Sequence, residues 1–365
     1  MNLFVVESPT QALNAIEARE RFPGGRNELV VLETGLFDRN VFERVIDRRN
    51  WDRVEYLPFA LLGRDRDFGK RPARNLRERA IEVGLVFYGT LLRERINRLA
   101  RRAGPVERLF LGQYRDDTHL WFRHLARRCP HGELFLLDDG TDTVLVNDQR
   151  EAEVTSDGPT RVPKPKGWKS RLRRALTKWD ARGAENLTFF TSLDIDVNAR
   201  DRVVRNDYRN LRSLAATGGD DTRVFFLGQT LVDDGYLPVE GFFRALGSVV
   251  DHYRGRPVTY VPHPRESARY VDEIARRTPF EVRRFDVPFE VEVTLRGNRP
   301  GTIAGFFSSA LENCARIFDG DVAVEAIHID PGTLLKQREL VARLYAHLDR
   351  TEGVQVVRVV AERSS

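Results

Sequence analysis

The stretch LFLLDDGTDT, Leu134–Thr143, runs four apolar residues directly into two adjacent carboxylates and a glycine. An apolar run without polar alternation is typical of a strand that is buried on both faces, as in the parallel sheets of α/β proteins. Ligands of such sheets bind beyond the carboxyl ends of the strands. The stretch therefore predicts a buried parallel strand that ends, at Asp138, Asp139 and Gly140, on the ligand-binding edge of a sheet.

Similar apolar runs alternate with helical patterns along the chain. Residues 10–22 and 265–277 carry apolar residues at helical spacing and are expected to be crossover helices. The other expected strands lie at residues 3–6, 29–33, 108–112, 187–191, 223–228, 258–261 and 302–307. This rhythm predicts an α/β protein with two Rossmann-like domains, 1–215 and 216–365, divided within the Gly-rich stretch LAATGGDDT.

The composition of the 365-residue chain is that of a globular protein, with 41% hydrophobic and 31% charged residues and a net charge of +5. Two cysteines, Cys129 and Cys314, match no metal or redox spacing, so we expect buried free thiols in a reducing compartment. No apolar stretch is long enough for a membrane span. We therefore expect a cytoplasmic protein without a metal or cofactor, whose contact with the inner membrane, if any, is peripheral.

The carboxylates Asp138 and Asp139 allow two interpretations. A neighbouring charge can raise the pKa of a carboxyl and make it a general base. Alternatively, Asp and Gly are simply the residues that a tight turn favours. The local sequence leaves both open.

A histidine between two prolines follows another expected strand, in VTYVPHPRE. The prolines restrict the backbone around His263 and hold the imidazole at the strand end. A fixed histidine beside Arg265 suits a departing phosphate, because one can donate a proton and the other can neutralise charge. A loop histidine with a satisfied hydrogen bond is the alternative.

Two serines follow the strand in TIAGFFSSALEN. Ser308 and Ser309 stand at the expected start of a helix, whose free amides can bind an anion. Ser309 and Glu312 also form a capping-box pattern. Both interpretations can hold together.

Three further patterns point elsewhere. No Gly-rich nucleotide fingerprint is present. Asp194 and Asp196 resemble a metal-binding DxD pair, so a metal-dependent glycosyltransferase remains an alternative interpretation. Residues 160–182 hold nine Lys or Arg and one Asp, a local +8. They predict either a solvated helix or a surface that contacts membrane lipid or nucleic acid.

Taken in order, the DDG, HP and SS motifs resemble the bacterial sialyltransferases, most closely glycosyltransferase family 52, the lipooligosaccharide sialyltransferases, and the polysialyltransferases. The resemblance spans residues 108 to 312. It implies a GT-B-like fold, in which the parallel sheets of two Rossmann-like domains face a central cleft. It also implies a CMP-activated sialic acid donor, inversion at the anomeric carbon, no metal, and a glycan or glycolipid acceptor.

The resemblance assigns roles to individual residues. It implies that His263 is the general acid toward the CMP phosphate and that Ser308 and Ser309 bind this phosphate. It implies that Asp138 or Asp139 is the base, with Asp233 and Asp234 as a second candidate pair. The remaining expected substrate-binding residues are Gly140, Gly228, Gln229, Pro264, Arg265 and Glu292, the last four residues after Pro288.

The resemblance also bears on partners. It places the acceptor in the N-terminal domain and CMP in the C-terminal domain. It implies no nucleic-acid partner, and it leaves a homodimer open. Residues 160–182 remain a candidate for peripheral membrane contact.

Overall fold

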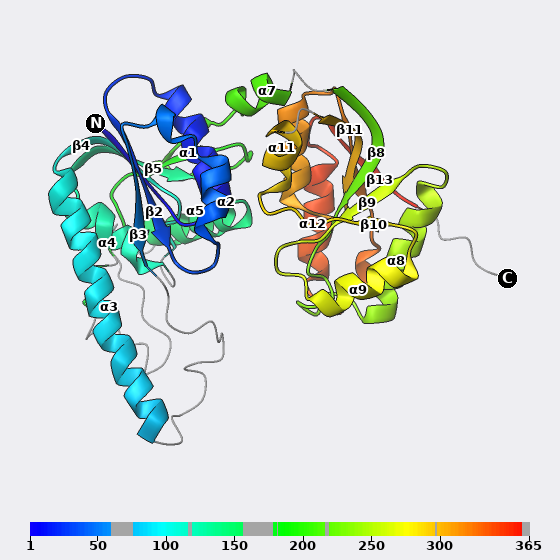
Figure 1. Cartoon of the computed structure of the whole chain (residues 1–365), viewed down its shortest axis with the longest axis horizontal. Coiled ribbons are helices and arrows are strands. Elements are labelled where there is room, and N and C mark those ends of the chain that lie inside the picture. The colour runs from blue at the N-terminus through cyan, green and yellow to red at the C-terminus, as the bar shows by residue number, and fades with distance from the viewer. Residues whose placement is uncertain are drawn as a thin grey trace. The chain divides into compact units, whose positions relative to one another are not determined.

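The computed structural model describes residues 1–59, 76–115, 119–155, 178–180, 182–215, 219–295 and 298–359. The chain divides into two compact units, Met1–Asn206 and Asp207–Ser365. Each unit is an α/β layer structure with one parallel sheet (Figure 1). These units confirm the predicted fold class of two parallel α/β domains.

The first unit contains a seven-stranded sheet in the order β3-β2-β1-β4-β5-β6-β7, in which all neighbouring strands are parallel. Its elements are β1 (Asn2–Val6), α1 (Pro9–Arg21), β2 (Asn27–Glu33), α2 (Arg39–Val45), η1 (Arg48–Asn50), β3 (Arg53–Pro58), α3 (Leu76–Ala103), β4 (Val106–Leu111), α4 (Leu120–Arg128), β5 (His131–Leu137), α5 (Thr141–Thr155), β6 (Thr188–Thr191) and β7 (Arg202–Arg205).

The second unit contains a six-stranded parallel sheet in the order β10-β9-β8-β11-β12-β13. Its elements are α7 (Arg209–Ala215), β8 (Gly219–Leu227), α8 (Val239–His252), β9 (Val258–Val261), α9 (Ala268–Arg277), β10 (Glu281–Val282), α10 (Phe289–Leu295), β11 (Asn298–Gly305), α11 (Ser309–Phe318), β12 (Ala323–Ile327), η2 (Pro331–Thr333), α12 (Arg338–Leu348) and β13 (Val354–Val357).

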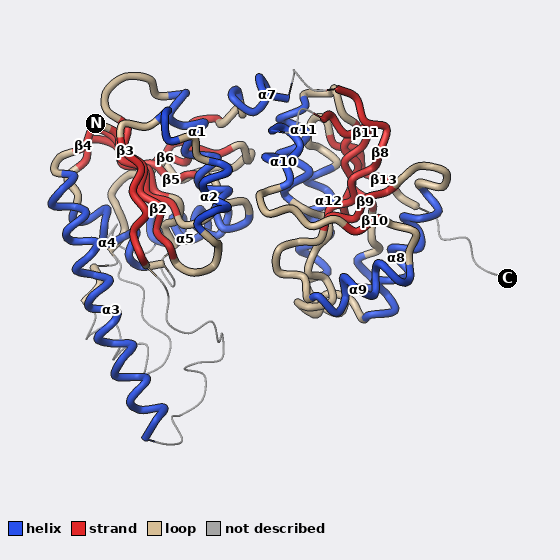
Figure 2. Tube along the Cα trace, viewed as in Figure 1, coloured by secondary structure: helices blue, strands red, loops and turns tan. Residues whose placement is uncertain are grey.

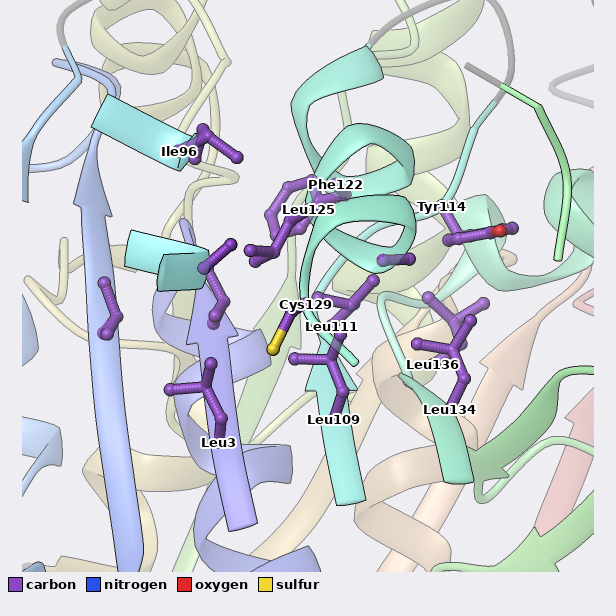
Figure 3. Close-up of a cluster of buried hydrophobic side chains, with 14 of the residues drawn as sticks. Leu3, Ile96, Leu109, Leu111, Tyr114, Phe122, Leu125, Cys129, Leu134 and Leu136 are labelled. Atoms are coloured by element: carbon purple, nitrogen blue, oxygen red, sulfur yellow. The ribbon is translucent and has the colours of Figure 1, made fainter. Parts of the chain in front are cut away.

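Two apolar clusters cover the two faces of the first sheet, which explains the continuous apolar strands. One face packs α3 and α4 on β1, β4 and β5, as in Figure 3, where Ile96 and Phe122 lie over Leu3, Leu109 and Leu134. The other face packs α1 and α2 on the alternate side chains of the same strands. Figure 2 shows helices on both sides of the second sheet as well.

All eight strands expected from apolar runs and both crossover helices are present. The division between the units lies at Asn206 and Asp207, nine residues before the expected one, because α7 packs against α10 and α11 of the second unit. Cys129 and Cys314 are buried free thiols, as expected. Burial raises the pKa of Cys129 to about 11.

In the described part of the chain, no helix has both the length and the apolar composition that a bilayer span needs. The basic stretch 160–182 lies almost wholly outside the described residues. Its expected contact with lipid stays a prediction.

Candidate functional site

Asp138 is a buried anchor at the carboxyl end of β5. It is 3% exposed, and five hydrogen bonds reach its two oxygens. Gly140 N–H at 3.0 Å and Thr143 Oγ1 at 2.8 Å donate to Oδ1. Thr191 Oγ1 at 2.7 Å, with the N–H and hydroxyl of Ser192, donates to Oδ2. The carboxylate therefore ties the ends of β5 and β6 to the start of α5.

Asp139 is the member of the pair that reaches solvent. It is half-buried, and Gln11 Nε2 donates to its Oδ2 at 2.9 Å. Burial raises the pKa of Asp139 to about 7, and Asp142 and Asp138 add to this rise while Gln11 opposes it. A carboxyl that titrates near neutral pH is suited to proton transfer. The geometry favours Asp139 over Asp138 as the base of this unit.

Gly140 serves the backbone of the turn. Its φ is +63°, in the left-handed region that glycine adopts at little cost, and this turns its N–H toward Asp138. The turn interpretation and the base interpretation of the DDG motif thus apply to different residues of it. Asp138 and Gly140 form the turn, and Asp139 remains the candidate base.

The second unit holds His263 directly beyond the carboxyl end of β9. The N–H of Arg265 donates to His263 Nδ1 at 3.1 Å, so the proton of the neutral ring is on Nε2. Burial and the Arg265 charge lower the pKa of His263, and the Asp234 carboxylate opposes this. The neutral ring can therefore offer its Nε2–H to an anionic oxygen.

Sequence reasoning missed the residue that fixes this turn, Glu266. Its Oε2 accepts the His263 N–H at 2.6 Å, and its Oε1 accepts the Tyr260 hydroxyl at 2.7 Å. Burial raises the pKa of Glu266 to about 7. The only sequence signal was a glutamate three residues after the histidine, a spacing that lets a side chain close a tight turn.

Gly228 makes room for this anchor. A Cβ there would lie 2.4 Å from Glu266 Oε2 and 2.5 Å from the Tyr260 hydroxyl oxygen. Gly228 therefore has a structural role, and its expected part in substrate binding stays a prediction. The neighbouring Gln229 accepts the Phe307 N–H at 3.1 Å and so joins the ends of β8 and β11.

The second acidic pair lies in the loop after β8. Asp233 is exposed, and its Oδ2 accepts the N–H of Ser267 at the start of α9. Asp234 is half-buried, accepts the Thr230 hydroxyl at 2.5 Å and faces His263 electrostatically. The Asp234 charge thus acts on the His263 ring, while the Asp233 charge acts on Glu266 and Tyr260.

Ser308 is the N-cap of α11, and its hydroxyl accepts the Ala310 N–H at 3.3 Å. Ser309 is the first residue of the helix, so the expected capping box of Ser309 with Glu312 is wrong. Glu312 lies one position further along than a capping box requires, and it pairs with Arg316 at 2.6 Å and His347 at 3.1 Å. The helix N-terminus remains a candidate anion site beside Gln229.

The other expected site residues are spread over the two units. Pro264 and Arg265 are exposed beside His263, and Glu292 is buried on α10. Asp194 and Asp196 are exposed in the loop after β6. Among the described residues, no group of three or more His, Cys, Asp or Glu could hold a metal ion. Substrate binding by these residues stays a prediction.

Comparison with known proteins gives one strong match. A family model described as alpha-2,8-polysialyltransferase matches residues 2–324. A search of curated proteins found no match.

Solved structures resemble the chain only weakly. They include the Escherichia coli heptosyltransferase WaaC with ADP, at 14% identity and TM-score 0.42 over 97% of this chain and 99% of that one. A glycosyl transferase family 9 protein from Veillonella parvula has 10% identity and TM-score 0.41 over 98% and 85%. A UDP-GlcNAc 2-epimerase from Methanocaldococcus jannaschii has 12% identity and TM-score 0.45 over 98% and 89%. The fold assignment therefore depends on the two parallel sheets themselves.

The two carboxylates of the DDG turn are expected to respond oppositely to amide substitution. Asp138→Asn places an NH2 group among five donors, so we expect the free energy of unfolding to fall by about 3 kcal/mol. Asp139→Asn should not lower it near pH 8, because the raised pKa means that the ionised form costs stability there. Urea unfolding of both variants measures this difference, and equal losses would contradict the assignment.

Glu266→Gln is expected to loosen the His263 turn. The two donors reach different oxygens of Glu266, and in glutamine one of these becomes an NH2 group that cannot accept, so unfolding free energy should fall by about 1–3 kcal/mol and turnover should fall with it. Gly228→Ala should act alike because its Cβ displaces the same carboxylate. The control is Gly247→Ala on α8, where a Cβ meets nothing within 4 Å. Lower stability with unchanged turnover would show that the turn does not serve the reaction.

Proposed function

The chain belongs to the alpha-2,8-polysialyltransferase family, and from this membership we propose that it transfers sialic acid from a CMP-activated donor to a glycan acceptor, with inversion and without a metal ion. The observation that carries the proposal is the His263 turn. A neutral histidine with its proton on Nε2, fixed by Glu266 and faced by Asp234, lies on the ligand edge of the second sheet.

The leaving group defines what the second unit has to do. When the bond between the anomeric carbon and CMP breaks, the pair of electrons moves to a phosphate oxygen. His263 donates from Nε2 to this oxygen, and the amides at the start of α11, capped by Ser308, attract its charge. A monophosphate ester leaves with less charge than a diphosphate, which is why the proposal includes no metal.

The acceptor defines what the first unit has to do. Attack on the anomeric carbon requires that the acceptor hydroxyl lose its proton. Asp139 takes this proton, since it reaches solvent and titrates near neutral pH. Asp234 is the alternative base, and its charge, which opposes the lowering of the His263 pKa, suits it better to supporting that ring.

Donor class is tested by ligand-dependent stability of the full chain. We expect CMP to raise the melting temperature while UDP, GDP and ADP at equal concentration do not, because a ligand that binds only the folded state stabilises it. Stabilisation by UDP alone would contradict the donor assignment. Retained turnover in a chelator tests the absence of a metal requirement.

His263→Ala should keep the fold and lower turnover by roughly 10²- to 10⁴-fold, the usual effect of losing a general acid. His252→Ala is the matched control, because His252 lies in the same unit and pairs with Glu325 at 3.0 Å. Initial rates of CMP release measure both variants. Equal rates for the two would remove His263 from the mechanism.

A further inference from the structure

Glu7 lies at a position of the first sheet that no sequence motif marks. It follows the carboxyl end of β1, which has β2 on one side and β4 on the other. The chain moves from β1 to β2 and later returns to β4, so the strand order reverses here. Open α/β sheets bind ligands at such a switch point.

One side chain, Gln11, links Glu7 to Asp139. The Gln11 Oε1 accepts the Glu7 N–H at 2.9 Å, and its Nε2 donates to Asp139 Oδ2 at 2.9 Å. The link needs glycine at position 112, because a Cβ on Gly112 would lie 1.9 Å from Gln11 Oε1. Gln11 therefore ties the Glu7 backbone to the Asp139 carboxylate across the ends of β1 and β5.

The Glu7 carboxyl is buried, and none of the described arginines or lysines forms an ion pair with it. It is 4% exposed, its Oε1 lies 3.1 Å from His119 Nε2, and its Oε2 is buried with no hydrogen bond of normal geometry to any described residue. His119 has a φ of +50°, in the left-handed region that residues other than glycine adopt infrequently. Strained residues and unsatisfied buried groups reduce stability and often mark functional sites.

The groups that face Glu7 are mainly acidic. Burial raises the pKa of Glu7 well above its usual value of 4.5, and Asp139 and Asp142 raise it further, while the Trp121 indole lowers it in part. Asp142 is itself paired with Arg115 at 2.9 Å. The Asp139 charge therefore favours the protonated form of Glu7, and carboxyls that interact strongly titrate as a pair.

We propose that Glu7 and Asp139 form a functional carboxyl pair that shares one proton, with Glu7 holding the proton and Asp139 carrying the charge. The role of the pair rests on the proposed function, since the acceptor hydroxyl is what Asp139 deprotonates. In that step the acceptor O–H bond breaks, its proton moves to Asp139, and Glu7 keeps its own proton. Glu7 is a positioning residue that leaves Asp139 as the charged member.

The first test measures melting temperatures of the full chain without substrate, so it does not depend on the proposed function. A raised pKa means that the protonated form stabilises the fold, and this stability is lost as the pH rises above the unfolded-state pKa. Glu7→Gln and Asp139→Asn cannot ionise. We therefore expect each to raise the melting temperature by about 2–4 °C near pH 8, with a smaller gain near pH 5.

The double variant tests the sharing itself. Replacing one carboxyl by an amide removes the repulsion that raises the proton affinity of the other, so the double variant should gain less than the sum of the singles. Glu28→Gln is the control, because Glu28 is 6% exposed in the same sheet but pairs with Arg26 at 2.9 Å and should give no gain. Additive gains, or a lower melting temperature for Glu7→Gln near pH 8, would overturn the proposal.

Turnover provides the second test. Glutamine resembles a neutral carboxyl in shape and hydrogen bonding, so Glu7→Gln should stay within about threefold of the parent, while Glu7→Ala falls further. Asp139→Asn should lose roughly 10²- to 10⁴-fold. An inactive Glu7→Gln with a normal fold would overturn the proposal, because the working charge would then be on Glu7.

Discussion

The hydrogen bonds that surround the buried Asp138 carboxylate decide where the chemistry of the first unit can occur. They tie the ends of β5 and β6 to the start of α5, and they occupy both oxygens of Asp138. The next residue, Asp139, is thereby turned out of the core. A carboxylate that anchors the turn thus sits directly before one that can exchange a proton.

The second unit uses the same arrangement with different residues. Glu266 is the buried anchor, and it holds the backbone of His263 three residues earlier. Both strand-end turns also need a glycine. Gly140 adopts the left-handed conformation beside Asp138, and Gly228 leaves space for Glu266. Each unit therefore separates the group that fixes a strand end from the group that faces the ligand edge.

The sequence predicted the parallel core and the place of the motifs, because apolar strands such as Leu3–Val6 carry an unambiguous signal. Edge strands such as β3, in which charged residues stand beside apolar ones, and the Arg-rich helix α3 lacked that signal. Glu7, Gln11 and Glu266 were missed for another reason. Their roles depend on contacts across strands or with a glycine elsewhere in the chain, and only the folded backbone brings these together.

The central claim is that the chain transfers sialic acid from a CMP-activated donor to a glycan acceptor. Its most direct test incubates the full chain with CMP-activated sialic acid and an oligosialic acid acceptor in excess chelator, and measures released CMP together with the mass and anomeric configuration of the product. The account predicts that one CMP is released for each sialic acid residue added to the acceptor. Each new linkage should show inversion at the anomeric carbon. Absence of transfer, a requirement for a metal, or retention at the anomeric carbon would contradict it.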